Sequence, residues 1–227
     1  MSASQVPAEE GARLFEELLA VHTVMTRGAQ LIAGSFTRLA GGAAVDTKTL
    51  VTTTQWLVDF ARRHQRSGDK LLWPVLRERF PLALRRLDRL TEDDALNERI
   101  DELDGVIARI ADERTVGGSV DWGHAMKEGT VSSHRIRDGL AEQLAVEETL
   151  LRGLFAKAPD EDIRSLRKAV RDGLPRTGPH LVFGLLEHPE PVPGRDRVHA
   201  CFPQPVRWAR GVLINKFRKT LRDLAAE

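Results

Sequence analysis

The sequence predicts an all-α protein: an antiparallel four-helix bundle followed by a helical C-terminal extension. Two observations predict this fold class. In four long segments, apolar residues recur at steps of three, four or seven, which is the period of a helix with one buried face. Between these segments, no stretch alternates apolar and polar residues as a half-buried strand would. Long amphipathic helices bury their apolar faces against one another, and a bundle achieves this.

The first two helices of the predicted bundle have recognisable ends. The first should stop at Gly41 and Gly42, after an apolar stripe formed by Leu14, Leu18, Val21, Met25, Ile32, Phe36 and Leu39. Asp46 is of the type that caps a helix N-terminus, so the second helix should begin there, bend near Pro74 and stop at Pro81. Its inward face is formed by Leu50, Leu57, Ala61, His64, Leu71 and Val75.

Two further stripes define the third and fourth helices. The third helix ends at the Gly117-Gly118 loop, and its stripe is Leu87, Leu90, Leu96, Ile100, Leu103, Ile107 and Ile110. His124 and His134 should lie in or beside the loop that follows. The fourth helix ends before Pro159, and its stripe is Ile136, Leu140, Leu144, Glu147, Leu151 and Leu154.

The composition changes after Pro159, where the extension begins. We place the bundle at residues 8–158 and an extension packed on the bundle at residues 159–227. The extension should contain a short helix around Ile163 to Val170, then a Pro- and Gly-rich run from Pro175 to Pro205. A basic amphipathic helix should follow, with its cationic face in solvent and with apolar positions at Val206, Leu213, Phe217 and Leu221.

Charge and composition limit the function classes. Lys and Arg number 34 against 33 Asp and Glu, so the net charge of +1 provides no global field to recruit nucleic acid or an anionic membrane. Cys201 is the single cysteine, and no run approaches the roughly 20 apolar residues of a membrane span. We expect that the N-terminal residues are not a secretory signal, because they lack an apolar run flanked by Lys or Arg. We expect a cytoplasmic monomer or homodimer that binds a small molecule and neither nucleic acid nor membrane.

Three ionisable side chains lie in phase with the buried stripes. His22 belongs to the first stripe, His64 to the second and Glu147 to the fourth. A buried imidazole or carboxylate must be hydrogen-bonded, neutralised or bound to a metal. One inward histidine alone is more often a satisfied core residue. Three such groups on different helices are the arrangement from which bundles build metal sites.

Motifs around these residues resemble those of the hemerythrin/HHE family. The run from His64 to Pro74, HQRSGDKLLWP, resembles the second-helix motif His-His-x-x-Glu-Glu with its Leu-aromatic-Pro ending. Gln143 to Glu148, QLAVEE, is similar to the fourth-helix His-Leu-x-x-Glu-Glu. His22 stands where the family has its first-helix histidine. Glu92 to Leu96 resembles the third-helix pattern Glu-His-x-x-Leu, with Asp93 at the histidine.

The resemblance spans roughly residues 10–157, and the tail is like the C-terminal extensions of bacterial members. It implies a four-helix bundle that holds non-haem iron between its helices. Three ligand positions are kept, and four are changed to Gly68, Asp93, Asn97 and Gln143. In the family, histidines of the first two helices serve one iron and those of the last two serve the other. The changes therefore fall on one half of the implied site.

The remaining residues have a metal chemistry of their own. Two imidazoles and one carboxylate form a facial set that leaves open positions on ferrous iron. We expect one or two Fe ions, with Mn as an alternative, at ligands drawn from His22, His64, Glu147, Asp93 and Asp69. Hydrogen-bond partners of the ligands are expected to be Gln143, Gln65 and Glu148. The alternative is a metal-free site in which these groups satisfy one another.

Three functions are consistent with the sequence. The first is a non-haem iron protein that binds, senses or activates O2, NO or peroxide at a divergent site. The second is an O2-dependent mono- or dinuclear oxidoreductase that acts on a small organic substrate. An elongated apolar cavity reaching Gly68 would favour this second function, because glycine leaves space there. The third is a metal-free helical module that binds a partner.

Overall fold

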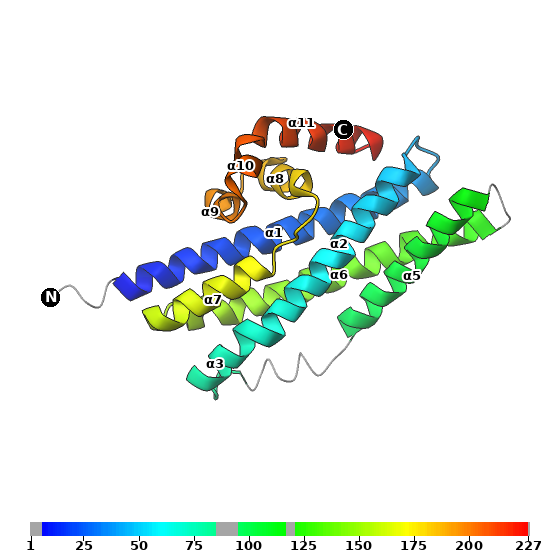
Figure 1. Cartoon of the computed structure of the whole chain (residues 1–227). Helices are drawn as coiled ribbons and strands as arrows, with labels where there is room; N and C mark the ends of the chain where they lie inside the picture. The colour runs from blue at the N-terminus through cyan, green and yellow to red at the C-terminus, as the bar shows by residue number, and fades with distance from the viewer. Residues whose placement is uncertain (1–5, 85–94, 117–120, 227) are drawn as a thin grey trace.

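The structure is a computed structural model of the chain, and it describes residues 6–84, 95–116 and 121–226. These residues form helices joined by turns and loops, and no strand occurs among them (Figure 1). The predicted all-α class is therefore confirmed. The side chains of residues 6–8, 113–116 and 121 lie outside this description.

Four long helices enclose a common interior. They are α1 (Val6–Ala40), α2 (Thr47–Ser67), α5 (Ala95–Val116) and α6 (Asp121–Phe155). α1 contacts α2 and α6, and α5 contacts the same two helices. The chain reverses direction from each of these helices to the next, as the colours in Figure 1 show. Apolar stripes of all four helices form one continuous core.

The start of α2 agrees with its predicted cap. The Asp46 carboxylate accepts a hydrogen bond from the backbone N–H of Thr49 at 2.7 Å. This bond satisfies one of the N–H groups that a helix leaves without an intrahelical partner. The N-terminus of α2 is therefore fixed by a local sequence signal.

The predicted bend near Pro74 takes the form of a π-helical segment. α2 ends at Ser67, and the chain continues through the π-helix η1 (Gly68–Leu72) into α3 (Trp73–Arg79). Pro74 has no N–H, and in an α-helix its ring would clash with the carbonyl of the residue four positions earlier. The Trp73 N–H instead bonds to the Gly68 carbonyl, five residues back. The helix thus widens just before the proline.

The two helices of the second half differ in part from the predictions. Leu87 and Leu90, predicted for the third helix, lie outside the described residues. α6 begins at Asp121, so the prediction that His124 and His134 lie in or beside a loop is wrong. Both lie within α6, because burial of Ala125 and Met126 extends the packed part of this helix beyond the predicted apolar stripe.

The C-terminal part is helical in more places than the sequence indicated. Its helices are α7 (Asp160–Asp172), α8 (Pro179–Glu187), α9 (Arg195–Ala200), α10 (Gln204–Trp208) and α11 (Arg210–Asp223). α8 lies inside the Pro- and Gly-rich run. Its residues from Leu181 to Leu186 are all buried, so it shows no one-sided stripe.

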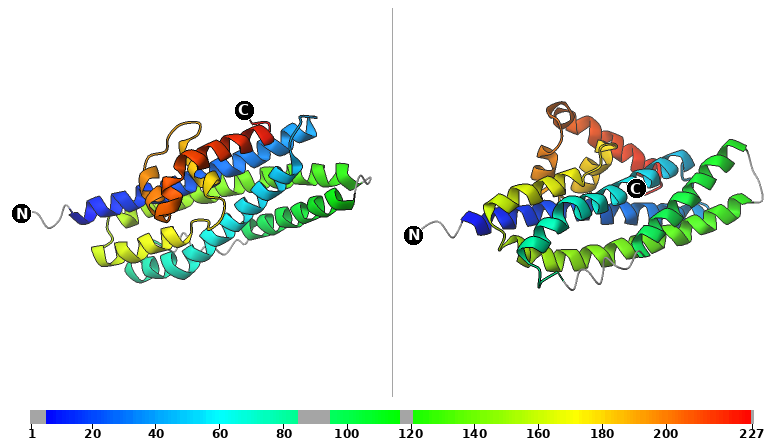
Figure 2. Two further views of the ribbon diagram at one scale, coloured as in Figure 1. Left: turned by 45° about the horizontal axis from the view of Figure 1, so that its top comes forward. Right: turned by 60° about the horizontal axis from the view of Figure 1, so that its bottom comes forward.

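These helices occupy two places on the long helices (Figure 2). α7 packs against α1, α2, η1 and α3, and so forms a wall of the interior. α8 and α9 pack on α1, and α11 packs on α8. Among the described residues, no helix combines the length and apolar character needed to cross a membrane.

Candidate metal centre

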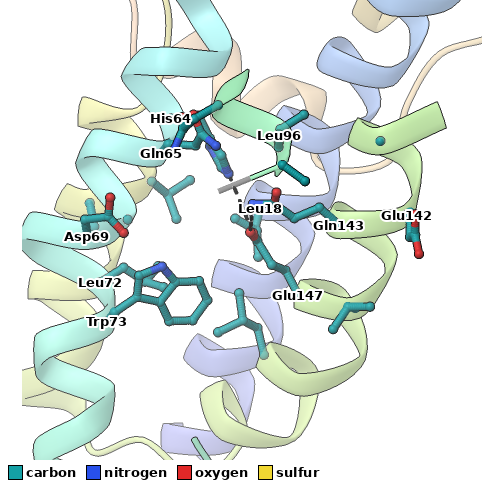
Figure 3. Close-up of a pocket in the computed structure, with 18 of the residues that line it drawn as sticks. Leu18, His64, Gln65, Asp69, Leu72, Trp73, Leu96, Glu142, Gln143 and Glu147 are labelled. Carbon is teal, nitrogen blue, oxygen red and sulfur yellow. Dashed lines mark hydrogen bonds and ion pairs between the residues drawn. The ribbon is translucent and has the colours of Figure 1, made fainter. Parts of the chain in front are cut away.

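Three of the predicted ligands converge in the interior. His22 comes from α1, His64 from α2 and Glu147 from α6, and one ligand atom of each lies within 4.8 Å of the others. His22 is 1% exposed and Glu147 is 7% exposed, whereas His64 is half-buried. The two imidazole rings meet edge to face, with centroids 5.1 Å apart. Figure 3 shows His64 and Glu147 facing each other across the interior.

The His22 ring is held in an orientation suited to a ligand. Its Nδ1 lies 3.0 Å from Glu148 Oε1. A carboxylate only accepts, so Nδ1 carries the hydrogen in a neutral ring and leaves a lone pair on Nε2. Nε2 is buried and has no hydrogen-bond partner in the part of the chain that the structure describes. Burial lowers the pKa of His22, which favours the neutral ring that a metal requires.

Glu147 presents a charged carboxylate to both histidines. Its Oε2 lies 3.8 Å from His22 Nε2 and 3.8 Å from His64 Nε2. Its Oε1 accepts a hydrogen bond from Gln143 Nε2 at 3.0 Å. Burial acts to raise the pKa of Glu147, but the attraction of His64 and His22 and the Gln143 bond outweigh it and lower the pKa. The carboxylate is therefore ionised at neutral pH.

The donor set fits one divalent metal ion. Metal bonds of 2.0–2.2 Å place neighbouring ligand atoms about 3.0–3.4 Å apart. Glu147 Oε2 lies 3.8 Å from each imidazole and the three ligand atoms lie within 4.8 Å of one another, so the side chains would draw together by up to about 1.5 Å to bind one ion. The buried, unpartnered Nε2 of His22 is the atom that such an ion would satisfy.

The other predicted ligands do not join this cluster. Asp93 lies outside the described residues. Asp69 is an exposed residue at the edge of a neighbouring cavity, and it is not part of the three-residue cluster. The cavity wall partly encloses its carboxyl group, and this burial, with the charge of Glu147, raises the pKa of Asp69.

Two of the three predicted hydrogen-bond partners contact the ligands. Gln143 bonds to Glu147, and Glu148 pairs with His22. Gln65 lines the cavity instead, and its Oε1 is buried without a hydrogen-bond partner among the described residues.

A cavity of about 400 Å³ opens beside the cluster, and His64 and Glu147 form part of its wall. It reaches Gly68, as the expected substrate space would. Trp73 fills part of the room there, because a Cβ atom at Gly68 would lie 3.1 Å from Trp73 Nε1. The lining is mixed in character, with apolar side chains and several charged ones (Figure 3).

Sequence reasoning missed two contributors to this region. Ala169 and Val170 of α7 line the cavity, and Ser67 Oγ donates a hydrogen bond to the Ala169 carbonyl at 2.7 Å. Arg99 of α5 also lines it. A signal for Arg99 was present, since it lies four residues before Leu103 of the buried stripe and so on the same side of the helix.

Comparison of the chain with models of known protein families, with curated proteins and with solved structures finds no match. The candidate metal centre therefore rests on its own residues. It is defined by the spacing of His22, His64 and Glu147 in the sequence and by their convergence in the structure.

Proposed function

We propose that this protein is a hemerythrin-like non-haem iron protein, in which α1, α2, α5 and α6 act as an antiparallel four-helix bundle. His22, His64 and Glu147 hold one iron ion, with Mn as the alternative metal. The observation that carries the proposal is the convergence of three ligand atoms within 4.8 Å, one of them a buried nitrogen without a partner among the described residues. Two nitrogens and one carboxylate oxygen suit such a metal.

The residues around the cluster have defined tasks in this proposal. Glu148 fixes the His22 tautomer, and Gln143 orients Glu147. Apolar neighbours such as Leu18, which is 2% exposed, surround the buried His22, whereas His64 and Glu147 face the cavity. Ferrous iron bound there would supply open positions for O2, NO or peroxide. We propose these small molecules as its partners in the cytoplasm.

Metal analysis of protein purified from iron-supplemented cells tests the proposal. We expect about one iron ion per chain, since one facial ligand set is complete among the residues that the structure describes. His64→Ala should lose most of the metal. His124→Ala is the matched control, because His124 is an exposed histidine on α6 whose side chain is 74% accessible.

An anomalous-scattering map at the iron edge distinguishes the alternatives. One peak within bonding distance of His22, His64 and Glu147 supports the proposal. Two bridged irons would refute the single-ion site and favour a dinuclear oxidase. Absence of metal from the wild-type protein, with folding intact, would favour the metal-free partner-binding module.

One observation favours a second candidate function, an O2-dependent oxidoreductase that acts on a small organic substrate. The cavity of about 400 Å³ lies within the range of about 300–1,000 Å³ that is usual for ligand pockets. It reaches Gly68, and His64 and Glu147 form part of its wall. A substrate in this cavity would therefore lie next to the proposed iron. Oxygen consumption that requires both iron and an added organic compound is the test.

A further inference from the structure

The cavity follows one face of α6. Its lining residues on this helix recur at steps of one, three and four positions and so lie on one face: Gly139, Glu142, Gln143, Val146, Glu147 and Leu151. At 1.5 Å per residue, this face is about 18 Å long. Glu147 lies between its ends, so an elongated molecule in the cavity would pass the cluster.

The end of the cavity near Leu151 is apolar. Leu72, Trp73 and Val170 line it together with Leu151, and each of these four side chains is at least nine-tenths buried. Figure 3 shows Leu72 and Trp73 on the side of Glu147 opposite to Leu96. An alkyl or aromatic group would be removed from water there, at about 25 cal/mol for each Å² of apolar surface.

The other end holds the half-buried guanidinium of Arg99. Arg99 lies directly over Gly139 of α6, since a Cβ atom at Gly139 would be 2.4 Å from Arg99 Nη1. No hydrogen bond or ion pair joins Arg99 to another residue described here, but the negative charge of the exposed Asp138 on α6 acts on Arg99 from a longer distance. An anion bound beside this half-buried cation would add a direct, charge-assisted hydrogen bond. Gly139 supplies the space that this placement of the guanidinium requires.

We propose that the cavity binds an amphiphilic organic carboxylate, with its apolar body between Trp73 and Leu151 and its carboxylate on Arg99. The planar guanidinium can donate two parallel hydrogen bonds to a carboxylate. Two acidic residues, Asp69 and Glu142, also line the cavity; Glu142 is exposed to solvent, and partial burial raises the pKa of Asp69 and so disfavours its charged form. That such a carboxylate is a substrate rests on the oxidoreductase function proposed above. Its binding in the cavity requires no metal.

Calorimetric titration of the metal-free protein tests the carboxylate preference. The probes are octanoate and octanamide, which share an alkyl chain and differ in charge. Octanoate should bind at least about tenfold more tightly, because a hydrogen bond to a charged group exceeds a neutral one by about that factor. Arg99→Gln should weaken octanoate binding about tenfold and leave octanamide binding unchanged.

Two further variants separate the Arg99 contact from a general disturbance. In Gly139→Ala the new methyl group takes the place of the Arg99 guanidinium, so octanoate should bind more weakly, while alanine favours the helix. Arg109→Gln is the matched control on the same helix, because Arg109 is paired with Glu128. It should leave both affinities unchanged.

Three outcomes would overturn the inference. They are equal affinity for octanoate and octanamide, failure of both to bind, and tighter binding of octylammonium, which would show that Asp69 and Glu142 dominate. Iron content of the Arg99→Gln protein is measured separately and should equal that of the wild type. Failure of the carboxylate site is thereby distinguished from failure of the metal site.

Discussion

The two sides of the interior around Glu147 differ in what they present to it. On the α1 and α2 side, two imidazoles lie 3.8 Å from its carboxylate, and one of them is locked by Glu148. On its other side, Glu147 faces the cavity, which is lined by residues of α2, η1, α5, α6 and α7 and holds Arg99 at its far end. One side therefore supplies ligand atoms, and the other supplies space.

The packing of α5 therefore does not depend on the polar groups around Glu147. α5 still contributes Leu103, Ile107 and Ile110 to the core, each 1% exposed or less. These apolar residues pack α5 against its neighbours and form no polar contact with His22, His64 or Glu147. The proposed metal ligation and the packing of α5 are thus carried by different residues, and mutations should affect them separately.

The largest effect is expected for His22→Gln, which removes a ligand on the imidazole side. A neutral amide is a poor ligand for ferrous iron, so iron affinity should fall by more than the roughly 10–100-fold of an outer-shell change. Competition with a chelator measures the affinity. His134→Gln is the control, since His134 bonds to Thr37 at 2.9 Å and lies outside the cluster. Equal loss in both variants would contradict the site.

A smaller effect is expected for Glu148→Ala, which leaves all three ligands in place. Without the carboxylate on Nδ1, the His22 ring loses its fixed tautomer, and iron affinity should fall about 10–100-fold. The same competition assay applies. Glu142→Ala, on the cavity side of the same helix, should leave iron affinity unchanged. A strong loss there would mean that the two sides are not independent.

Packing away from the site is tested by Gly184→Ala. A Cβ atom at Gly184 would lie 1.9 Å from Cγ of the buried Phe217 ring, so the free energy of unfolding should fall by about 1–3 kcal/mol. Gly153→Ala, with no neighbour within 4 Å of the new Cβ, should raise it by up to about 1 kcal/mol. Urea denaturation measures both. If the Gly184→Ala protein bound a different amount of iron per folded chain, packing at this position and iron binding would not be independent.

A pH-dependent effect away from the site concerns His180 in α8. Burial and the charge of Lys216 lower the pKa of His180 to about 4. As the pH falls from about 6.5 towards 4, the unfolded chain takes up a proton on this residue before the folded chain does, so stability falls. His180→Gln should therefore lose less stability than the wild type between pH 7 and pH 5, measured as the urea midpoint. Identical changes in both proteins would exclude the contribution of His180.

Spacing in the sequence predicted the long helices and the convergence of His22, His64 and Glu147, because steps of three, four and seven define one helix face. It did not predict α8, since a helix buried on all sides has no periodic stripe. Pro74 signalled a break in the second helix but not its π-helical form.

The position of α7 could not be predicted either. Its amphipathic pattern shows that one face is buried, but not against which element. That information lies in contacts distant in the sequence, such as the bond from Ser67 to Ala169. The same applies to Arg99, whose place over Gly139 depends on how α5 and α6 approach each other.

The wall formed by α7 is synthesised after the three clustered residues His22, His64 and Glu147. Glu147, the last of the three proposed ligands, is synthesised 26 residues before Gly173, where a Cβ atom would lie 3.4 Å from His64 Nδ1. At about 5–20 residues per second, a growing chain adds Gly173 roughly 1–5 s after Glu147. In the proposed iron protein, iron present during translation would therefore meet a site without this wall, whereas iron supplied later would enter through the cavity that His64 and Glu147 line. Comparing iron uptake during and after synthesis would measure the difference.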